Sequence, residues 1–188
     1  ITDAFFETMS GFTTTGATIL DNIESMPHGI LFWRSLTQWI GGLGIVCFTI
    51  VLLPGFGASS QMLYLSEATG VTHNKLYPKT RVMARYIFMV YILLTAVESA
   101  LLMAGGMGLF DAVCHSMTTT ATGGFSTKQA SIAYWHSPYI EYVVSLFMLL
   151  SAINFSLYIV ACKSKWKQLR KNTELKWFAC SVGLLTLV

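Results

Sequence analysis

The sequence predicts an all-α membrane protein built from repeated units of short helix, loop and membrane helix. The first observation is composition: the 188 residues are 54% hydrophobic and 11% charged, whereas soluble domains carry about 25% charged residues. Apolar stretches near the roughly 20 residues that cross a bilayer lie at 29–53, 81–106 and 139–162, and another begins near Leu175. This composition excludes an ordinary soluble protein, and no nucleic-acid partner is expected.

The second observation is an internal repeat. Residues 3–10 read DAFFETMS and residues 111–118 read DAVCHSMT, an offset of 111 − 3 = 108. Each copy leads into a stretch rich in Thr and Gly, then into an outer loop and an apolar span. The copies predict short helices at 2–12 and 110–119, with Asp3 and Asp111 as N-caps. Such helices are too short to cross a bilayer, so we expect re-entrant segments.

Basic residues gather in two stretches that set the expected topology. By the positive-inside rule both stretches lie in the cytoplasm; they comprise Lys75, Lys79, Arg81 and Arg85, and Lys163, Lys165, Lys167, Arg170 and Lys171. The span at 81–106 then leaves the cytoplasm and the span at 139–162 returns to it. The segment between them must enter and leave the membrane on the outer side, as a re-entrant loop does.

The Thr/Gly loops would lie at membrane depth, where loop backbone is unusual. Loop backbone is tolerated there only inside protein or along a water-filled path. Backbone carbonyls and Thr hydroxyls can replace the hydration shell of a potassium ion, and Gly admits the angles that turn carbonyls toward one axis. The alternative is that small residues merely allow close helix packing, which explains one such loop better than two. The loops therefore predict an ion pathway.

Three strings resemble one known family. Residues 10–18, SGFTTTGAT, resemble the second pore loop of the Trk/Ktr/HKT potassium transporter superfamily, and residues 32–45, FWRSLTQWIGGLGI, resemble its exit helix. Residues 121–127, ATGGFST, resemble its third loop. The resemblance covers essentially the whole chain and is strongest to the bacterial Trk-type pore subunit. It implies a potassium-channel-like architecture of four helix–pore loop–helix repeats around one pore.

The resemblance also implies how the chain is divided. Residues 1–54 would hold the pore loop and exit helix of the second repeat, 55–79 a cytoplasmic connector, 80–162 the complete third repeat, 163–173 a basic cytoplasmic loop, and 174–188 the start of the fourth repeat. The first and fourth filter loops are absent. We therefore expect a fragment that carries half of a four-sided filter.

The family's ion-coordinating residues match two sets of positions here. The first loop contributes Thr14, Thr15, Gly16 and Ala17, and the second contributes Thr120, Ala121, Thr122, Gly123 and Gly124. The register of the second loop has two solutions. A Thr-x-Gly alignment pairs Gly123 with Gly16, whereas the offset of 108 pairs Gly124 with Gly16. We favour Gly123.

The resemblance further implies a gate below the filter, where the third repeat's exit helix is interrupted. The matching stretch is 150–156, and its candidate gate residues are Ser151, Ala152, Asn154 and Ser156. Because this stretch contains no glycine, an ordinary helix with Asn154 bonded to a neighbour is the alternative.

Glu98 is the one acidic residue deep within a predicted span, and Arg34 is a basic residue in another. Glu98 is costly at membrane depth, and we expect it to pair with a basic residue of an absent repeat or to tune the field of the pore. Arg34 lies near the outer end of its helix, where we expect it to reach the interface or to cap the helix. We do not expect it in the filter.

The function that follows is gated potassium uptake across the bacterial cytoplasmic (inner) membrane, by a multi-pass protein in contact with membrane lipid. Potassium is the transported substrate, and no bound cofactor is expected. Family resemblance implies a homodimer and a cytoplasmic nucleotide-binding regulatory subunit that is TrkA-like. The alternative is a sodium- or proton-coupled secondary transporter, which predicts inverted repeats, whereas both copies here run in the same sense. No catalytic motif or paired metal-ligand spacing suggests an enzyme or another metal site.

Overall fold

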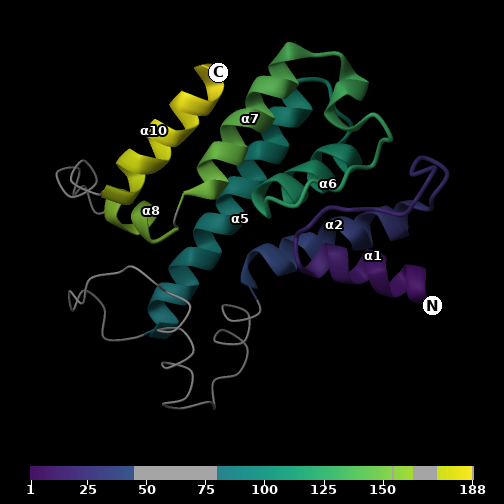
Figure 1. The fold of residues 1–188 in the computed structure, drawn as a ribbon, viewed down its shortest axis with the longest axis horizontal. Helices are drawn as coiled ribbons and strands as arrows, with labels where there is room; N and C mark the ends of the chain where they lie inside the picture. The colour runs from purple at the N-terminus through teal and green to yellow at the C-terminus, as the bar shows by residue number, and fades with distance from the viewer. Residues whose placement is uncertain (45–79, 154, 163–172, 188) are drawn as a thin grey trace.

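The computed structural model describes residues 1–44, 80–153, 155–162 and 173–187, and the elements in these ranges are helical (Figure 1). They are α1 (Thr2–Phe12), α2 (His28–Gly42), α5 (Thr80–Ala104), α6 (Leu109–Thr120), the 3-10 helix η1 (Ser131–Trp135), α7 (Pro138–Ala152), α8 (Phe155–Cys162) and α10 (Thr173–Leu187). The expected connector at 55–79, most of the basic loop at 163–173 and the candidate gate residue Asn154 lie outside the described residues.

The two short helices predicted from the repeat are present. Helix α1 has the predicted bounds, and α6 begins and ends one residue beyond the predicted range 110–119. The predicted N-caps are wrong, because the caps are Ile1 and Gly108 and neither makes a side-chain capping bond. Asp3 and Asp111 lie inside the first turns instead, where a carboxylate stabilises the positive end of the helix dipole. The Asp111 carboxylate also accepts a hydrogen bond of 2.6 Å from the Thr127 hydroxyl.

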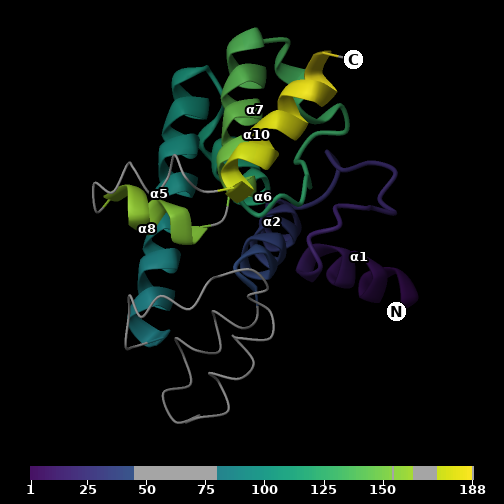
Figure 2. The same ribbon diagram turned by 60° about the vertical axis from the view of Figure 1, so that its left-hand side comes forward.

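Helix α2 packs against both short helices. It contacts α1, which precedes it in the chain, and α6, which belongs to the second copy of the repeat (Figures 1 and 2). Small residues allow these contacts to be close. A Cβ atom on Gly41 would collide with the carbonyl oxygen of Phe12, and one on Gly42 would lie 2.7 Å from the Cα atom of Ala121. Glycine is therefore required where α2 passes the ends of α1 and α6.

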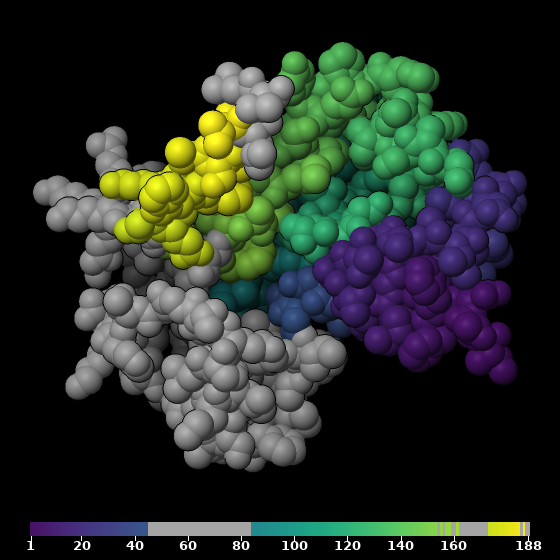
Figure 3. Space-filling view, viewed as in Figure 1, coloured from purple at the N-terminus to yellow at the C-terminus, as the bar shows by residue number. Residues whose placement is uncertain are grey.

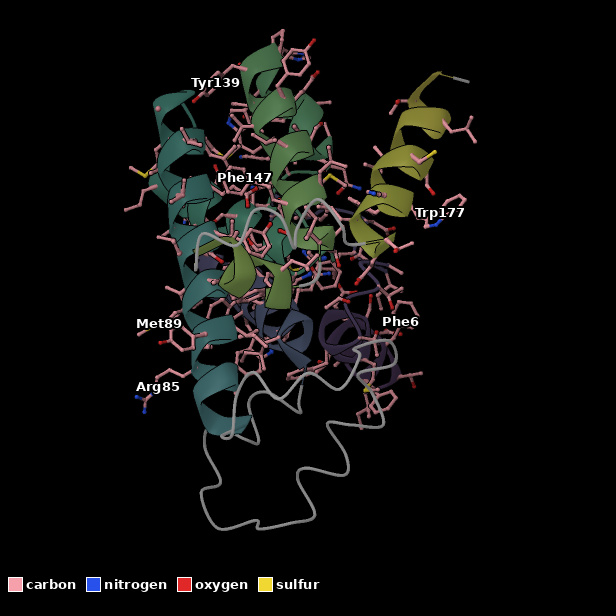
Figure 4. The ribbon with its side chains drawn as sticks, turned by 90° about the vertical axis from the view of Figure 1, so that its left-hand side faces the viewer. Phe6, Arg85, Met89, Tyr139, Phe147 and Trp177 are labelled. Carbon is pink, nitrogen blue, oxygen red and sulfur yellow. The ribbon has the colours of Figure 1, made fainter. Side chains whose placement is uncertain are left out.

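The apolar core lies among α5, α6 and α7. Its fully or nearly fully buried members come from all three helices and from the turn after α5; they are Leu102, Met107, Ala112, Ile140, Val143, Val144 and Phe147. Figure 4 labels Phe147 within this group and Tyr139 near the start of α7. Gly105 lets the end of α5 approach the Tyr139 ring, since a Cβ atom there would lie 2.8 Å from it.

Within the described residues, one helical stretch is long and apolar enough to cross a membrane, Ala84–Ala104 in α5. Its outward side chains Met89 and Leu93 are 58% and 61% exposed, and Figure 4 shows Arg85 and Met89 pointing away from the other helices. Of the span expected at 29–53, the structure describes only the first part, through Gly44. Helix α10 stands apart from the bundle in Figure 4, with Trp177 on its outer side.

The span expected at 139–162 is interrupted. Helix α7 ends at Ala152, Ile153 has extended backbone angles (φ −76°, ψ 138°), and α8 begins at Phe155 and turns away from the axis of α7 (Figure 2). The Tyr158 hydroxyl donates a hydrogen bond of 2.7 Å to the carbonyl oxygen of Leu150, a group that a continuous helix would pair with residue 154. The continuous-helix alternative is therefore wrong, and a glycine-free sequence makes the break.

The close contact of α2 with α6 gives a test of the packing. We expect Gly42→Val in the full-length protein to lower the free energy of unfolding by about 1–3 kcal/mol, the usual cost of overpacking. Gly29→Val is the matched control, because it lies in the same helix and a Cβ atom there meets nothing within 4 Å. Thermal unfolding in detergent measures both, and equal midpoints for the two variants would contradict the packing described here.

Candidate functional site

Helices α1 and α6 end in the same backbone motif. In each, two amide groups beyond the helix bond back to carbonyl oxygens of its last turn, which is the Schellman arrangement. The bonds are Thr14 N–H to Gly11 O (3.0 Å) and Thr15 N–H to Ser10 O (3.0 Å) in the first copy, and Thr122 N–H to Thr119 O (2.9 Å) and Gly123 N–H to Thr118 O (2.9 Å) in the second. Every donor and acceptor corresponds at the offset of 108.

The backbone angles fix the register of the second loop. Left-handed angles occur at Thr14 (φ 54°) and Gly16 (φ 76°) in the first loop, and at Thr122 (φ 55°) and Gly124 (φ 85°) in the second. Thus 122 − 14 = 108 and 124 − 16 = 108. The preference for Gly123 as the partner of Gly16 is wrong, because Gly124 has the left-handed angles that match those of Gly16. The conformation of a loop residue depends on its distance from the end of the preceding helix, not on its place in the letters Thr-x-Gly.

Threonine at the left-handed position is unusual. This position of a Schellman motif normally holds glycine, and a β-branched residue with positive φ is a conformational outlier. The left-handed conformation costs about 1–2 kcal/mol for a residue with a Cβ atom. Thr14 and Thr122 both carry this cost. The same backbone strain therefore occurs at corresponding positions of the two loops.

The two loops touch each other. A Cβ atom on Gly16 would collide with the carbonyl oxygen of Gly123, and one on Gly123 would collide with the side-chain amide of Gln38. On the other side the loops are open, with Thr15 and Ala17 exposed in the first and Thr122 and Gly124 exposed in the second. In Figure 3 the purple N-terminal segment lies directly against the green segments that follow α6 in the chain.

The candidate filter residues of the second copy do not all lie in the loop. Thr120 is the last residue of α6 and is buried, and Ala121 is the buried residue that caps it. In the first loop, the Ser10 hydroxyl donates a hydrogen bond of 2.6 Å to the carbonyl oxygen of Ala17. The residues brought together on the open side are therefore fewer than the nine expected from the sequence.

Arg34 is buried between the loops, which sequence reasoning missed. Its side chain is 4% exposed and pairs with Glu7, with Nη2 and Nε each 2.8 Å from Oε1. Nη2 also donates to the Thr18 hydroxyl (3.1 Å) and Nη1 to the carbonyl oxygen of Ser126 (3.4 Å), and the guanidinium lies 4.2 Å from the centre of the Phe125 ring. The expectation that Arg34 reaches the interface is wrong, because these groups bind it inside the protein.

Gln38 lies one turn beyond Arg34 on the same face of α2. It is fully buried, and its Oε1 accepts a hydrogen bond of 3.1 Å from the Phe125 N–H. Since a backbone N–H can only donate, this bond fixes which end of the amide faces the second loop. The sequence does indicate that this face of α2 contacts the loops. Polar or small residues recur there at helical spacing inside an apolar segment; they are Arg34, Thr37, Gln38 and Gly41.

The position of Glu7 in the first copy is held by His115 in the second, since 115 − 7 = 108. The Glu7 carboxylate accepts a hydrogen bond of 2.8 Å from the Thr18 hydroxyl. His115 Nε2 lies 3.0 Å from the hydroxyl of Ser126, and 126 − 18 = 108. Both copies therefore use the same helix position to hold the hydroxyl that follows the loop.

Glu98 is fully buried on α5 behind the end of α6. Its Oε2 accepts from the Thr120 hydroxyl at 3.4 Å, and that hydroxyl lies 3.3 Å from the hydroxyl of Thr95. Thr95 in turn accepts a hydrogen bond of 3.0 Å from the indole N–H of Trp39 on α2. The partners of Glu98 in the described part of the chain are thus hydroxyl groups, and pairing with a basic residue elsewhere stays a prediction.

Comparison with known proteins identifies the family. The family model described as TrkH, cation transport protein, matches residues 1–186. The Trk system potassium uptake protein TrkH of Escherichia coli K12 is 45% identical over 159 residues, which are 84% of this chain and 33% of that protein. TrkG of the same organism is 41% identical over 178 residues, 94% of this chain and 37% of that protein.

A solved structure agrees. The crystal structure of the potassium transporter TrkH from Vibrio parahaemolyticus matches with a TM-score of 0.68 and 37% identity, over 87% of this chain and 32% of that one. The chain spans about a third of the length of the relatives it matches. On the strength of the family model and of these relatives, the chain belongs to the TrkH family of cation transport proteins.

Proposed function

We propose that this chain supplies two of the loops that line a potassium-conducting pore in the bacterial cytoplasmic membrane. The observation that carries the proposal is the pair of loops with one strained backbone conformation, in contact through Gly16 and Gly123. Strained backbone that recurs at corresponding positions is a reason to infer function. The relatives are named as potassium uptake proteins, and we infer from these names that the conducted ion is potassium.

The ends of α1 and α6 suit a cation. Each helix ends at its loop, and the C-terminal end of a helix carries partial negative charge. In each loop, residues with left-handed angles flank one residue without them, at 14 and 16 and at 122 and 124. Such alternation turns successive carbonyls toward one side of the chain, as in filters where carbonyl oxygens replace the hydration shell of potassium. Thr14–Ala17 and Thr120–Gly124 are the residues to which we assign this role.

The whole transporter would contain more than this chain. We assign residues 1–54, 80–162 and 174–188 to the second, third and fourth repeats, joined by cytoplasmic segments at 55–79 and 163–173. The remaining repeats would complete a four-sided filter, in a homodimer that binds a TrkA-like nucleotide-binding subunit in the cytoplasm. The interruption after Ala152 is the proposed gate, to which we assign Ser151, Ala152, Asn154 and Ser156.

A pore accounts for the repeats better than a coupled secondary transporter does. By the placement of the basic residues, both units α1–loop–α2 and α6–loop–α7 would enter the membrane from its outer side, whereas many coupled transporters contain repeats of inverted topology. The basic test is growth of a bacterium without potassium uptake systems at low potassium, carrying the full-length protein. Absence of rescue by the wild-type protein would overturn the potassium assignment.

The left-handed glycines give a sharper test. We expect Gly16→Ala and Gly124→Ala to reduce potassium uptake about tenfold or more, because strain of about 1–2 kcal/mol changes the population of the native loop by that factor. Gly106→Ala is the matched control. Gly106 has a positive φ (95°) and, like Gly124, open space around it, but it lies in the turn between α5 and α6. Gly16→Ala adds the collision with the Gly123 carbonyl oxygen to the backbone strain, so Gly124→Ala is the variant that Gly106→Ala matches. Uptake reduced equally by all three variants would mean that the loops have no special role.

The strained threonines predict a conflict between stability and selectivity. We expect Thr14→Gly and Thr122→Gly to leave the midpoint of thermal unfolding unchanged or higher, because glycine adopts left-handed angles without steric cost. The same variants should lower the preference for potassium over sodium, since they remove a hydroxyl and loosen the loop. Ser131→Gly relieves the same kind of strain (φ 53°) outside the loops and should leave the preference unchanged. An unaltered preference in the threonine variants would remove them from the filter.

The proposed gate is tested through Tyr158. Tyr158→Phe removes its hydrogen bond to Leu150, which stabilises the break between α7 and α8 by about 1 kcal/mol. We expect the rate of potassium uptake to change several-fold while the preference for potassium over sodium stays constant. Tyr142→Phe, on the exposed side of α7, is the control. A change in ion preference with no change in rate would argue against a gate at this break.

A further inference from the structure

We infer that Arg34 is a positioning residue that ties the two loops to each other and thereby sets the discrimination between potassium and sodium. The inference rests on the proposed function of the loops and adds a determinant that lies outside them. Arg34 belongs to α2, and its side chain reaches both copies of the repeat.

On the side of the first loop, Arg34 binds an acid and a hydroxyl that are themselves joined. Glu7 accepts from Arg34, and its two carboxylate oxygens also accept from the Thr18 hydroxyl (2.8 Å) and the Ile19 N–H (3.2 Å). Arg34 closes the triangle by donating to the Thr18 hydroxyl at 3.1 Å. Thr18 directly follows the candidate filter stretch, so this triangle fixes the point at which the loop leaves the filter.

On the side of the second loop, Arg34 meets the equivalent point. Its Nη1 donates to the carbonyl oxygen of Ser126, which corresponds to Thr18 at the offset of 108. The guanidinium also lies over the ring of Phe125, and the N–H of that residue is held by Gln38. The Arg34 side chain therefore binds the residues that follow both loops, Thr18 and Ser126. The neighbouring Gln38 adds a hydrogen bond to the end of the second loop.

Only arginine can make this set of contacts. Its planar guanidinium presents five donors in a fixed fork, whereas lysine has a single ammonium on a flexible chain. A lysine at position 34 could keep the ion pair with Glu7 but could not span Thr18 and Ser126 together. Ion selectivity in such filters depends on how the coordinating oxygens are arranged. The substitution Arg34→Lys keeps the positive charge but loses the bridging geometry. It therefore tests the effect of the geometry alone.

The experiment uses the full-length protein reconstituted in liposomes, with reversal potentials giving the potassium-to-sodium permeability ratio. We expect Arg34→Lys to lower this ratio about tenfold, the effect of losing a hydrogen bond to a charged group. The matched control is Arg85→Lys, the same substitution at an exposed arginine near the start of α5, which should leave the ratio unchanged. Protein abundance in the membrane is measured for every variant.

A second pair of variants covers the case in which Arg34→Lys does not fold. Thr18→Val removes the hydroxyl that accepts from Arg34 and donates to Glu7, without changing the size of the side chain, and we expect it to lower the ratio. Thr18→Ser restores the hydroxyl and should restore the ratio. A ratio that stays at the wild-type value in Arg34→Lys, or in Thr18→Val where the arginine variant is not made, overturns the inference and leaves the proposed function intact. Reduced abundance with an unchanged ratio in the surviving protein overturns it equally. If the wild-type protein carries no potassium, both proposals fail together.

Discussion

The ion pair between the buried Arg34 and the partly buried Glu7 is the interaction on which the arrangement of the two loops depends. A charge taken out of water must be matched by a partner and by hydrogen bonds, and removal of one partner from such a pair costs about 3–5 kcal/mol. Here the carboxylate and the guanidinium together bind Thr18, Ile19 and Ser126. Helix α1, the first loop and α2 are consequently held as one unit, and the second loop is attached to that unit through a backbone carbonyl.

Much of the local structure could be predicted from the sequence, because its causes are local. The bounds of α1 and nearly those of α6 follow from the apolar pattern and from the Thr/Gly stretch after each helix. The register of the second loop was chosen wrongly, because the letters Thr-x-Gly do not report where the helix before them ends, whereas the repeat offset of 108 pairs Gly124 with Gly16 as the structure does. The place of Arg34 could not be predicted. Its partner Glu7 lies 34 − 7 = 27 residues away, and an arginine near the end of a membrane helix ordinarily reaches toward water.

The break between α7 and α8 was expected from family resemblance, but its physical cause was not. A break without glycine needs another way to satisfy the freed carbonyl groups, because unpaired backbone is costly in an apolar environment. Tyr158 supplies a donor to Leu150 from eight residues along the chain, and the ring of Phe155 packs against Tyr91 of α5 at 5.8 Å between centroids. The bend is thus held by side chains of α8 itself, which a search for glycine or proline does not find.

The correspondence of Glu7 with His115 has a consequence for the history of the molecule. If the two units arose by duplication of one ancestral segment, their sequences were identical at first and either could have occupied either position. Both still use this position to hold a hydroxyl group, but only the acid gives the guanidinium of α2 an opposite charge. A transplant of the second unit into the place of the first would set an imidazole against Arg34 and leave a cation buried without a carboxylate. Under this ancestry each copy would be specialised for its own contacts with α2, and recombination between the copies would be selected against even though their loops share hydrogen bonds and left-handed positions.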